Sequence, residues 1–341
     1  DLDPTDYDMV ALFNSELGKP GCLEGSPFYL GLDNNHGSAN DLVTVLLHEF
    51  SHGLGFLSTT DPETGEYLAG YPSVYDHFLY DATQELAWTS MTPAQRAVSA
   101  VNARRVAWTG AHVTRAAPDV LDAGTAELRV IAPTAIAGAY LVGTASFGPP
   151  PGSPGVTGEV MPVVDQANGI GLACTPLNAA NTLAVAGKIA LVDRGGCAFT
   201  QKALSVQAAG AIGMIVADTV AGGPPPSLGG IDPSITIPAV RITQADGGIL
   251  KAALRTRSRT RSGLRATIGV DPTVLAGTDA LGRVLVYTPS PVDPGSSVSH
   301  WDTIASPNQL MEPFISDDLL HTVAPPRDLT LPLLRDIGWN P

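Results

Sequence analysis

The stretch from Asp41 to Phe56 constrains the fold more than any other part of the chain. Its apolar residues recur at the spacing of a helix that packs on a core. Asn40 or Asp41 can serve as the N-cap. The sequence therefore predicts an amphipathic helix over residues 41–56 with its apolar face buried. That face would comprise Val43, Leu46, Leu47, Phe50 and Leu54.

Two histidines lie one turn apart in this predicted helix. At this spacing His48 and His52 point the same way and can share a metal ion. Glu49 lies on the adjacent edge, where a carboxylate can reach a water in the open position of the metal. This is the His-Glu-x-x-His pattern of zinc peptidases. The alternative is two histidines that share a face by chance, in a chain that has only seven histidines.

The bulk composition excludes several classes of protein. A length of 341 residues suggests two domains, and 44% hydrophobic with 15% charged residues indicates a folded protein. A net charge of −14 argues against nucleic acid as the main partner. No apolar run approaches the roughly 20 residues of a membrane helix. We expect a secreted protein, either mature or a fragment, since no signal peptide precedes Asp1.

Periodicity and turn residues predict the remaining elements in outline. An edge strand is expected in 26–33, helices in 73–81 and from Pro93 to about Arg104, and a strand in 106–110. Further on, strands are expected in 126–131, 188–192, 211–217 and 237–242, with a helix over 199–209 and a final helix in 328–339.

Part of the chain resembles the protease-associated (PA) domain. The residues that carry the resemblance are 187–199, Lys202, 208–216 and 237–240, and the likeness extends over about 120–268. It implies a non-catalytic domain that gates access to substrate or binds partners. The cysteines Cys174 and Cys197 fall in this region and can pair, and the resemblance favours that disulfide. Cys22 would then be left over.

A catalytic zinc ion needs a third protein ligand. The compact metzincin motif would place it six residues after His52, but that residue is Ser58. Asp61, Asp76 and His77 are local candidates, although their spacing gives none of them strong support.

The segment 295–313 offers a better candidate. Its Ser-His300-Trp and Leu-Met311-Glu-Pro sequences resemble the second half of a leishmanolysin-type active site, which belongs to the metzincins. The resemblance implies that His300 is the third zinc ligand and that Met311 packs beneath the metal. The short stretch before the helix and the missing cysteine framework of that family limit the likeness to the layout of the active site.

These observations predict an α+β protein with a zincin/metzincin-like catalytic domain in two parts, residues 1–116 and 270–341. A β-rich α/β PA domain, residues 117–269, would be inserted between them. The expected activity is that of a secreted zinc endopeptidase that binds one Zn²⁺. Glu49 would be its general base, and the strand Phe28–Leu32 would align a protein or peptide substrate. The alternative is a non-catalytic adaptor that works through the PA domain.

Other features receive weaker predictions. A calcium ion beside Asp33 lacks the Asp-x-Asp spacing that would support it. The segment Lys251–Arg265 carries six basic residues; a solvated helix end and linker is favoured over a contact with a polyanion. No metal role is expected for His36, His112 or His321, and no oligomeric state is predicted.

Overall fold

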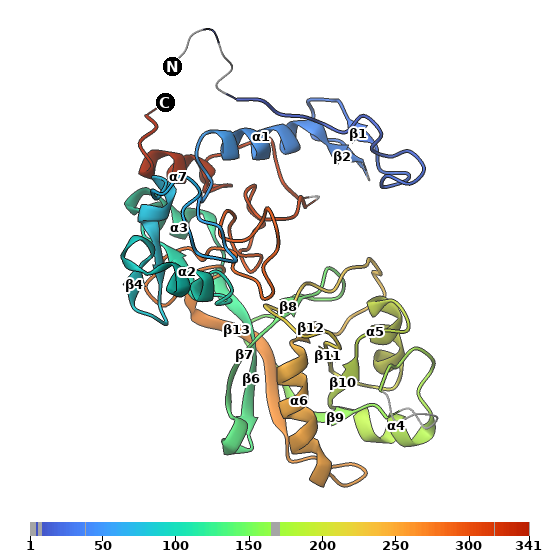
Figure 1. Cartoon of the computed structure of the whole chain (residues 1–341). Coiled ribbons are helices and arrows are strands. Elements are labelled where there is room, and N and C mark those ends of the chain that lie inside the picture. The colour runs from blue at the N-terminus through green and yellow to red at the C-terminus, as the bar shows by residue number, and fades with distance from the viewer. Residues whose placement is uncertain (1–4, 6–8, 38, 165–170, 317, 341) are drawn as a thin grey trace. The chain divides into compact units, whose positions relative to one another are not determined.

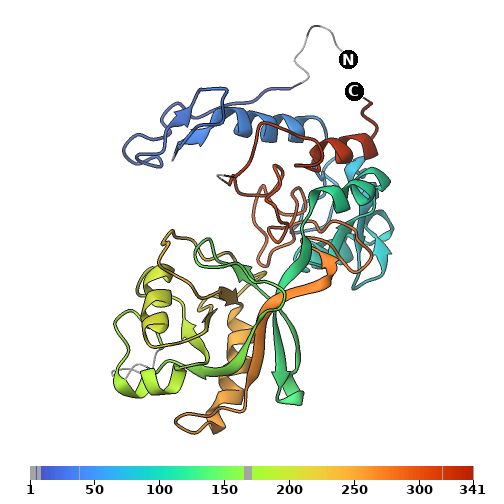
Figure 2. The same cartoon turned by 180° about the vertical axis from the view of Figure 1, so that it is seen from behind.

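The chain divides into two compact units. The computed structural model describes residues 5, 9–37, 39–164, 171–316 and 318–340. The first unit comprises Asp1–Ala123 and Val274–Pro341, and the second unit is Gly124–Thr273. The N-terminal segment (blue) and the C-terminal segment (red) therefore lie side by side in the first unit, as Figures 1 and 2 show. Within the described part of the chain, no helix has both the length and the apolar character to cross a membrane.

Helix α1 (Leu42–Gly53) follows a small parallel sheet of β1 (Phe28–Tyr29) and β2 (Asn40–Asp41). The carboxylate of Asp41 accepts a hydrogen bond from the backbone N–H of Thr44 at 3.0 Å, so Asp41, not Asn40, is the N-cap. The predicted helix is thereby confirmed in its start, and it ends three residues earlier than expected.

The predicted apolar face of α1 is only partly buried: Leu47 packs against the core, whereas the most buried residues are polar. Phe50, which was expected in the core, is 44% exposed. The polar atoms on the buried side are satisfied, because the Ser51 hydroxyl donates to the carbonyl of Leu47 and the His48 ring reaches another backbone carbonyl. The helix therefore packs through the side that carries a histidine. Its buried residues are Thr44, His48 and Ser51.

The rest of the first unit surrounds a three-stranded antiparallel sheet in the order β4-β3-β5. The elements are η1 (Tyr75–Phe78), β3 (Leu79–Asp81), β4 (Leu86–Ala87), η2 (Trp88–Ser90), α2 (Pro93–Ser99), β5 (Val106–Trp108), α3 (Ala111–Val120) and α7 (Thr330–Asp336).

Two predicted helices are shorter in the structure. The segment 73–81 forms one 3₁₀ turn and then a strand. The helix that starts at Pro93 ends at Ser99. Beyond it, Arg104 adopts a left-handed backbone with φ of 59° and lies 3.4 Å from the carboxylate of buried Asp302. A tertiary ion pair thus favours a turn where sequence periodicity predicted a helix.

Aromatic side chains from both segments form the core of the first unit. Phe56 packs edge-on against Trp301, with ring centroids 5.1 Å apart, and Trp301 contacts Trp108 in the same way. Met311 and Leu333 belong to the same buried cluster. Because these residues come from both ends of the chain, the first unit needs its two segments together.

The second unit contains an eight-stranded sheet in the order β7-β6-β13-β9-β10-β11-β12-β8. Strands β9 to β12 are parallel, whereas β13 and β8 run antiparallel to their neighbours β9 and β12. The strands are β6 (Ala123–Ala132), β7 (Gly138–Leu141), β8 (Gly143–Thr144), β9 (Val156–Pro162), β10 (Ile189–Asp193), β11 (Gly213–Ala217), β12 (Ala239–Ile242) and β13 (Arg265–Leu275). The helices are η3 (Thr134–Ile136), α4 (Ala179–Val185), α5 (Phe199–Ala208), α6 (Gln244–Ala253) and η4 (Leu254–Thr256).

The central strands are buried on both faces. Ile189 and Leu191 lie in one apolar cluster together with Leu250 of α6, and Ala190 lies in the other with Val206 of α5. Figure 1 shows α5 and α6 on opposite sides of these strands. Continuous apolar runs are typical of such doubly covered parallel strands, and the predictions for β10, β11, β12 and α5 are confirmed.

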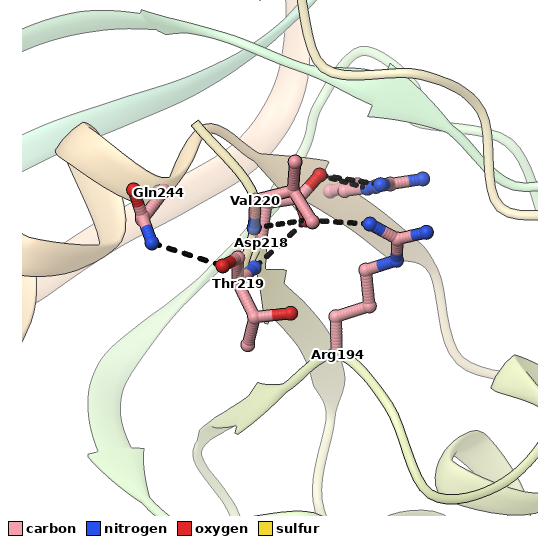
Figure 3. A network of polar contacts seen from close by, with 6 residues as sticks. Arg194, Asp218, Thr219, Val220 and Gln244 are labelled. Atoms are coloured by element: carbon pink, nitrogen blue, oxygen red, sulfur yellow. Dashed lines mark hydrogen bonds and ion pairs between the residues drawn. The ribbon is translucent and has the colours of Figure 1, made fainter. Parts of the chain in front are cut away.

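One carboxylate links the ends of three of these strands (Figure 3). Asp218 follows β11 and accepts hydrogen bonds from the backbone N–H groups of Thr219 and Val220 at 2.7 and 3.1 Å. It also pairs with Arg194, which follows β10, at 3.1 Å, and with Arg241 of β12. The side chain of Gln244 adds a hydrogen bond to the carbonyl of Thr219, and the network holds the carboxyl ends of the parallel strands together.

The disulfide between Cys174 and Cys197 is present, and Cys22 is free. The buried ammonium of Lys202 donates to the carbonyls of Leu172 at 2.7 Å and Gly195 at 2.6 Å, next to the disulfide. A buried cation is tolerated when its donors are satisfied in this way. The disulfide and Lys202 together hold the loop before α5.

Candidate metal site

Three histidine side chains converge in the first unit. His48 and His52 come from α1, and His300 comes from the C-terminal segment, 248 residues after His52. The Nε2 atom of His52 lies 3.1 Å from that of His48 and 3.2 Å from that of His300. The remaining pair, His300 and His48, is also 3.2 Å apart. The three Nε2 atoms thus form a nearly equilateral triangle.

The other ring nitrogen of each histidine is bound to a backbone carbonyl. The Nδ1 atoms of His48, His52 and His300 lie 2.7, 2.7 and 2.8 Å from the carbonyl oxygens of Leu310, Phe56 and Ser296, respectively. A carbonyl accepts only, so Nδ1 carries the proton and Nε2 presents its lone pair. These contacts fix the tautomer and orientation that metal-ligating histidines require.

The triangle fits a divalent cation. Ligand nitrogens in tetrahedral coordination, with Zn–N bonds of about 2.0–2.1 Å, lie roughly 3.3–3.4 Å apart. The observed separations of 3.1–3.2 Å are close to this value. Three lone pairs at such distances repel one another unless a cation lies between them. The donor set of three neutral imidazoles also leaves one position open.

Burial keeps these imidazoles neutral. It lowers the pKa of His300 to about 3, with the neighbouring His52 and His48 adding to the effect. Burial also lowers the pKa of His48, while the hydrogen bond to Leu310 and the charge of Glu49 oppose the shift. At pH 7 these two rings are therefore unprotonated, as metal ligation requires.

The local alternatives for a third ligand are engaged elsewhere. The buried carboxylate of Asp76 accepts hydrogen bonds from the hydroxyls of Ser58 at 2.6 Å and Thr60 at 3.2 Å, and from Ser73. Asp61 accepts from two backbone N–H groups of its own turn. His77 is not part of the cluster either: among the described residues, the group whose ligand atoms converge is His48, His52 and His300.

The turn that carries Met311 supports the site through the residue before it, Leu310. Met311 is fully buried in the core of the first unit, and its carbonyl accepts from the N–H of Trp301 at 2.8 Å. Leu310 holds His48 by its carbonyl, and its own N–H donates to the carboxylate of Asp328 at 2.7 Å. Sequence analysis missed Leu310 and Asp328. Leu310 acts through its backbone, and Asp328 does not belong to a recognisable sequence motif.

Glu49 is exposed and directly follows His48 on α1. Its charge acts on the His48 ring, since it raises the pKa of that imidazole against the larger effect of burial. A solvent-accessible carboxylate next to the histidine triangle can exchange protons with a bound water or substrate.

The other predicted features near α1 are structural. The Nε2 atom of His321 lies 2.9 Å from the N-cap carboxylate of Asp41. His36 contacts the carbonyl of Ala39 at 2.9 Å within its own loop. The carboxylate of Asp33 accepts hydrogen bonds from Tyr29 and from the N–H of Asn35, so it organises a turn.

Comparison with protein families gives one match. Residues 156–250, which lie in the second unit, match the family model described as PA domain. The predicted resemblance to this domain is confirmed for that part of the chain. The chain is thus a mixed α/β protein that contains a PA domain with a large mixed sheet. A comparison with the sequences of curated proteins returns no match.

Several solved peptidases show distant similarity. A zinc aminopeptidase from Bacillus subtilis is 21% identical, with 47% of this chain and 36% of that chain covered and a TM-score of 0.32. An aminopeptidase from Aneurinibacillus sp. strain AM-1 is 18% identical, with 63% and 45% covered and a TM-score of 0.33. A peptidase M28 precursor from Shewanella amazonensis is 12% identical, with 67% and 50% covered and a TM-score of 0.31.

The matched region spans half or less of each of these three structures. TM-scores near 0.3 do not assign a fold or an activity to this chain. The candidate function therefore has to come from the histidine site itself.

Proposed function

We propose that the first unit is a zinc-dependent endopeptidase with a zincin/metzincin-like layout, in which His48, His52 and His300 hold the metal. One observation carries this proposal. Three Nε2 atoms lie 3.1–3.2 Å apart, and the Nδ1 atom of each ring is already committed to a carbonyl. A protein that used these histidines only for packing would have no reason to turn three lone pairs toward one point.

The proposed chemistry divides between the metal and Glu49. Zinc supplies a Lewis acid that activates water and polarises the scissile carbonyl. The Glu49 carboxylate takes a proton from the attacking water and delivers it to the nitrogen of the leaving amine. The backbone carbonyls behind the three rings keep the imidazoles in the neutral ligating form, and the turn at Leu310 and Met311 supports them from below.

Substrate would bind in an extended form along β1. This strand pairs only with β2 among the described residues, so its other edge is free to accept a peptide. Leu30 and Leu32, which follow it, are 73% and 82% exposed. Their side chains would contact apolar side chains of the substrate.

The variant Glu49→Gln tests the mechanism. We expect casein hydrolysis to fall by at least about a hundredfold, because general base catalysis is lost, while one zinc ion per chain remains bound. Metal content is measured by plasma mass spectrometry on the same samples. Undiminished activity in this variant would refute the role of Glu49. Zinc without cleavage in the unchanged protein would instead favour the adaptor function.

The variant His300→Ala tests the ligand set. Loss of one of three ligands should lower zinc affinity by more than the roughly 10–100-fold that is typical for a supporting residue. His112→Ala is the matched control, since this exposed histidine lies on α3, outside the triangle. Equal zinc affinity in the two variants would exclude His300 as a ligand. Internal cleavage of a peptide blocked at both ends would separate endopeptidase from aminopeptidase activity.

We also propose that the protein works outside the cytosol, because a structural disulfide persists in oxidising compartments. Fractionation of the producing cells, followed by detection of the protein in each fraction with an antibody, tests this localisation.

A further inference from the structure

The charges of the chain are divided very unevenly between the two units. The second unit has 11 Lys and Arg against 8 Asp and Glu, whereas the first has 8 against 25. Within the second unit, residues 247–270 contain six basic residues and no acidic one. A compact cationic segment in an otherwise acidic protein attracts anionic partners.

The basic segment forms a structured loop after α6. The Ser258 N–H donates to the carbonyl of Arg261 at 2.7 Å, which closes a tight turn. Lys251 pairs with Asp193, but no ion pair is found among the described residues for Arg255, Arg257 or Arg259, nor for Arg261. Within the described part of the chain, none of these four guanidinium groups is thus committed to a carboxylate.

Two of these arginines line a pocket of about 370 Å³ beside α4. Its wall is mixed, and the apolar part includes Met161, Val164 and Ala184. The asparagines at the pocket are occupied: Asn178 caps α4, and the amide of Asn181 bonds both backbone groups of Val164. Arg257 and Arg259 therefore supply the polar groups that a ligand would meet.

Of the two, Arg257 is the more buried. Its Nη1 donates to the carbonyl of Leu254 at 3.2 Å, and the side chain is half-buried. Arg259 is exposed. Two guanidinium groups at one pocket suit a planar carboxylate, which accepts parallel hydrogen bonds from such groups.

We infer that this pocket binds a glutamate or aspartate side chain within an acidic segment of another protein. The volume lies within the range of about 300–1,000 Å³ that is usual for ligand pockets. The apolar wall can contact the methylene groups of such a side chain. None of the described residues that line the pocket is aromatic, so they offer no platform on which nucleic acid bases could stack. The inference does not depend on the proposed peptidase activity.

The test measures binding of a fluorescent peptide of alternating Glu and Gly, blocked at both ends, to the whole protein by polarisation. The double variant Arg257→Gln/Arg259→Gln should weaken binding at least tenfold. Arg255→Gln/Arg261→Gln removes the same charge outside the pocket and should change affinity less than about threefold, as screened charges do. Equal losses in both double variants would overturn the inference, as would unchanged binding.

A variant that keeps every charge provides a second readout. Ala180 lines the pocket from the exposed side of α4, so Ala180→Phe should fill the pocket without disturbing the core. We expect it to abolish peptide binding. Unchanged binding in Ala180→Phe, or stronger competition by heparin than by the unlabelled peptide, would show a diffuse polyanion surface in place of the pocket. The inactive variant Glu49→Gln serves as the background, so that cleavage cannot mimic loss of binding.

Discussion

In each residue of the histidine triangle, one ring nitrogen is hydrogen-bonded to a backbone carbonyl and the other points to a shared centre. The carbonyls belong to Leu310, Phe56 and Ser296, in three different loop segments. Preorganisation of this kind lowers the entropic cost of ordering ligands when the metal binds. A metal should therefore bind tightly without a large rearrangement of the three rings.

The metal-free protein should lose stability as the pH falls below about 6.5. Burial lowers the pKa of His300 to about 3 and also lowers that of His48. The unfolded chain then binds protons that the folded chain does not, so this stability is complete above pH 6.5 and is lost as the pH falls toward 3. Between pH 6.5 and 5 we expect a loss on the order of 2 kcal/mol from His300, and a further loss of the same sign from His48.

Urea unfolding of the chelator-treated protein at both pH values measures this effect. His300→Gln, which does not titrate at this position, should remove the contribution of His300 and so reduce the pH dependence. A pH dependence that is unchanged in this variant would mean that other groups cause it.

The sequence predicted the residues of the triangle unequally. His48 and His52 follow from their spacing, because one helical turn brings both rings to one side. His300 lies 248 residues beyond His52, and only the resemblance of its surroundings to a known active site pointed to it. Leu310 left no signal, since a backbone carbonyl looks the same in every residue, and Asp328 is recognisable only once the fold brings it to Leu310.

At the scale of elements, local capping was predictable and the choice of buried face was not. Residue type limited the N-cap of α1 to Asn40 or Asp41, and the structure has Asp41. Helix α3 was missed because it contains Pro118, and its first N–H groups bond Asp336 from the far end of the chain. The buried face of α1 likewise depends on the C-terminal segment that supplies its partners.

The cap of α1 provides a test at this scale. Asp41 accepts from the N–H of Thr44 and also lies 2.9 Å from Nε2 of His321. Asp41→Ala should destabilise the first unit by about 1 kcal/mol through loss of the cap and should weaken zinc binding, because α1 carries two ligands. The measurements are denaturant unfolding and zinc competition with a chelating dye.

Asp41→Asn separates the two contacts. Asparagine caps a helix as well as aspartate does but carries no charge for His321. We expect the free energy of unfolding to stay within a few tenths of a kcal/mol of that of the unchanged protein, because the cap is kept. If Asp41→Asn is as damaging as Asp41→Ala, the contact with His321 outweighs the cap.

At the scale of the whole molecule, the two units have separate apolar cores. One core contains Phe56, Trp108 and Trp301, and the clusters of the second unit lie on the two faces of its sheet. The parallel strands of that sheet were predictable because their apolar runs are continuous. The first unit was harder to predict, since its core joins segments from both ends of the chain.

Because the cores are separate, we expect removal of the disulfide to destabilise the second unit only. Cys174 and Cys197 are 23 residues apart, and opening a loop of that size costs about 3 kcal/mol in the chain-entropy account. Cys174→Ser/Cys197→Ser should therefore raise amide hydrogen exchange in β10, β11 and α5. Exchange in α1 and the zinc content should stay as they are, because neither cysteine belongs to the first unit.

Cys22→Ser, which leaves the disulfide intact, should leave exchange in the second unit unchanged. An equal rise in α1 and in the second unit would mean that the two units unfold together and that the histidine site depends on the sheet for its stability.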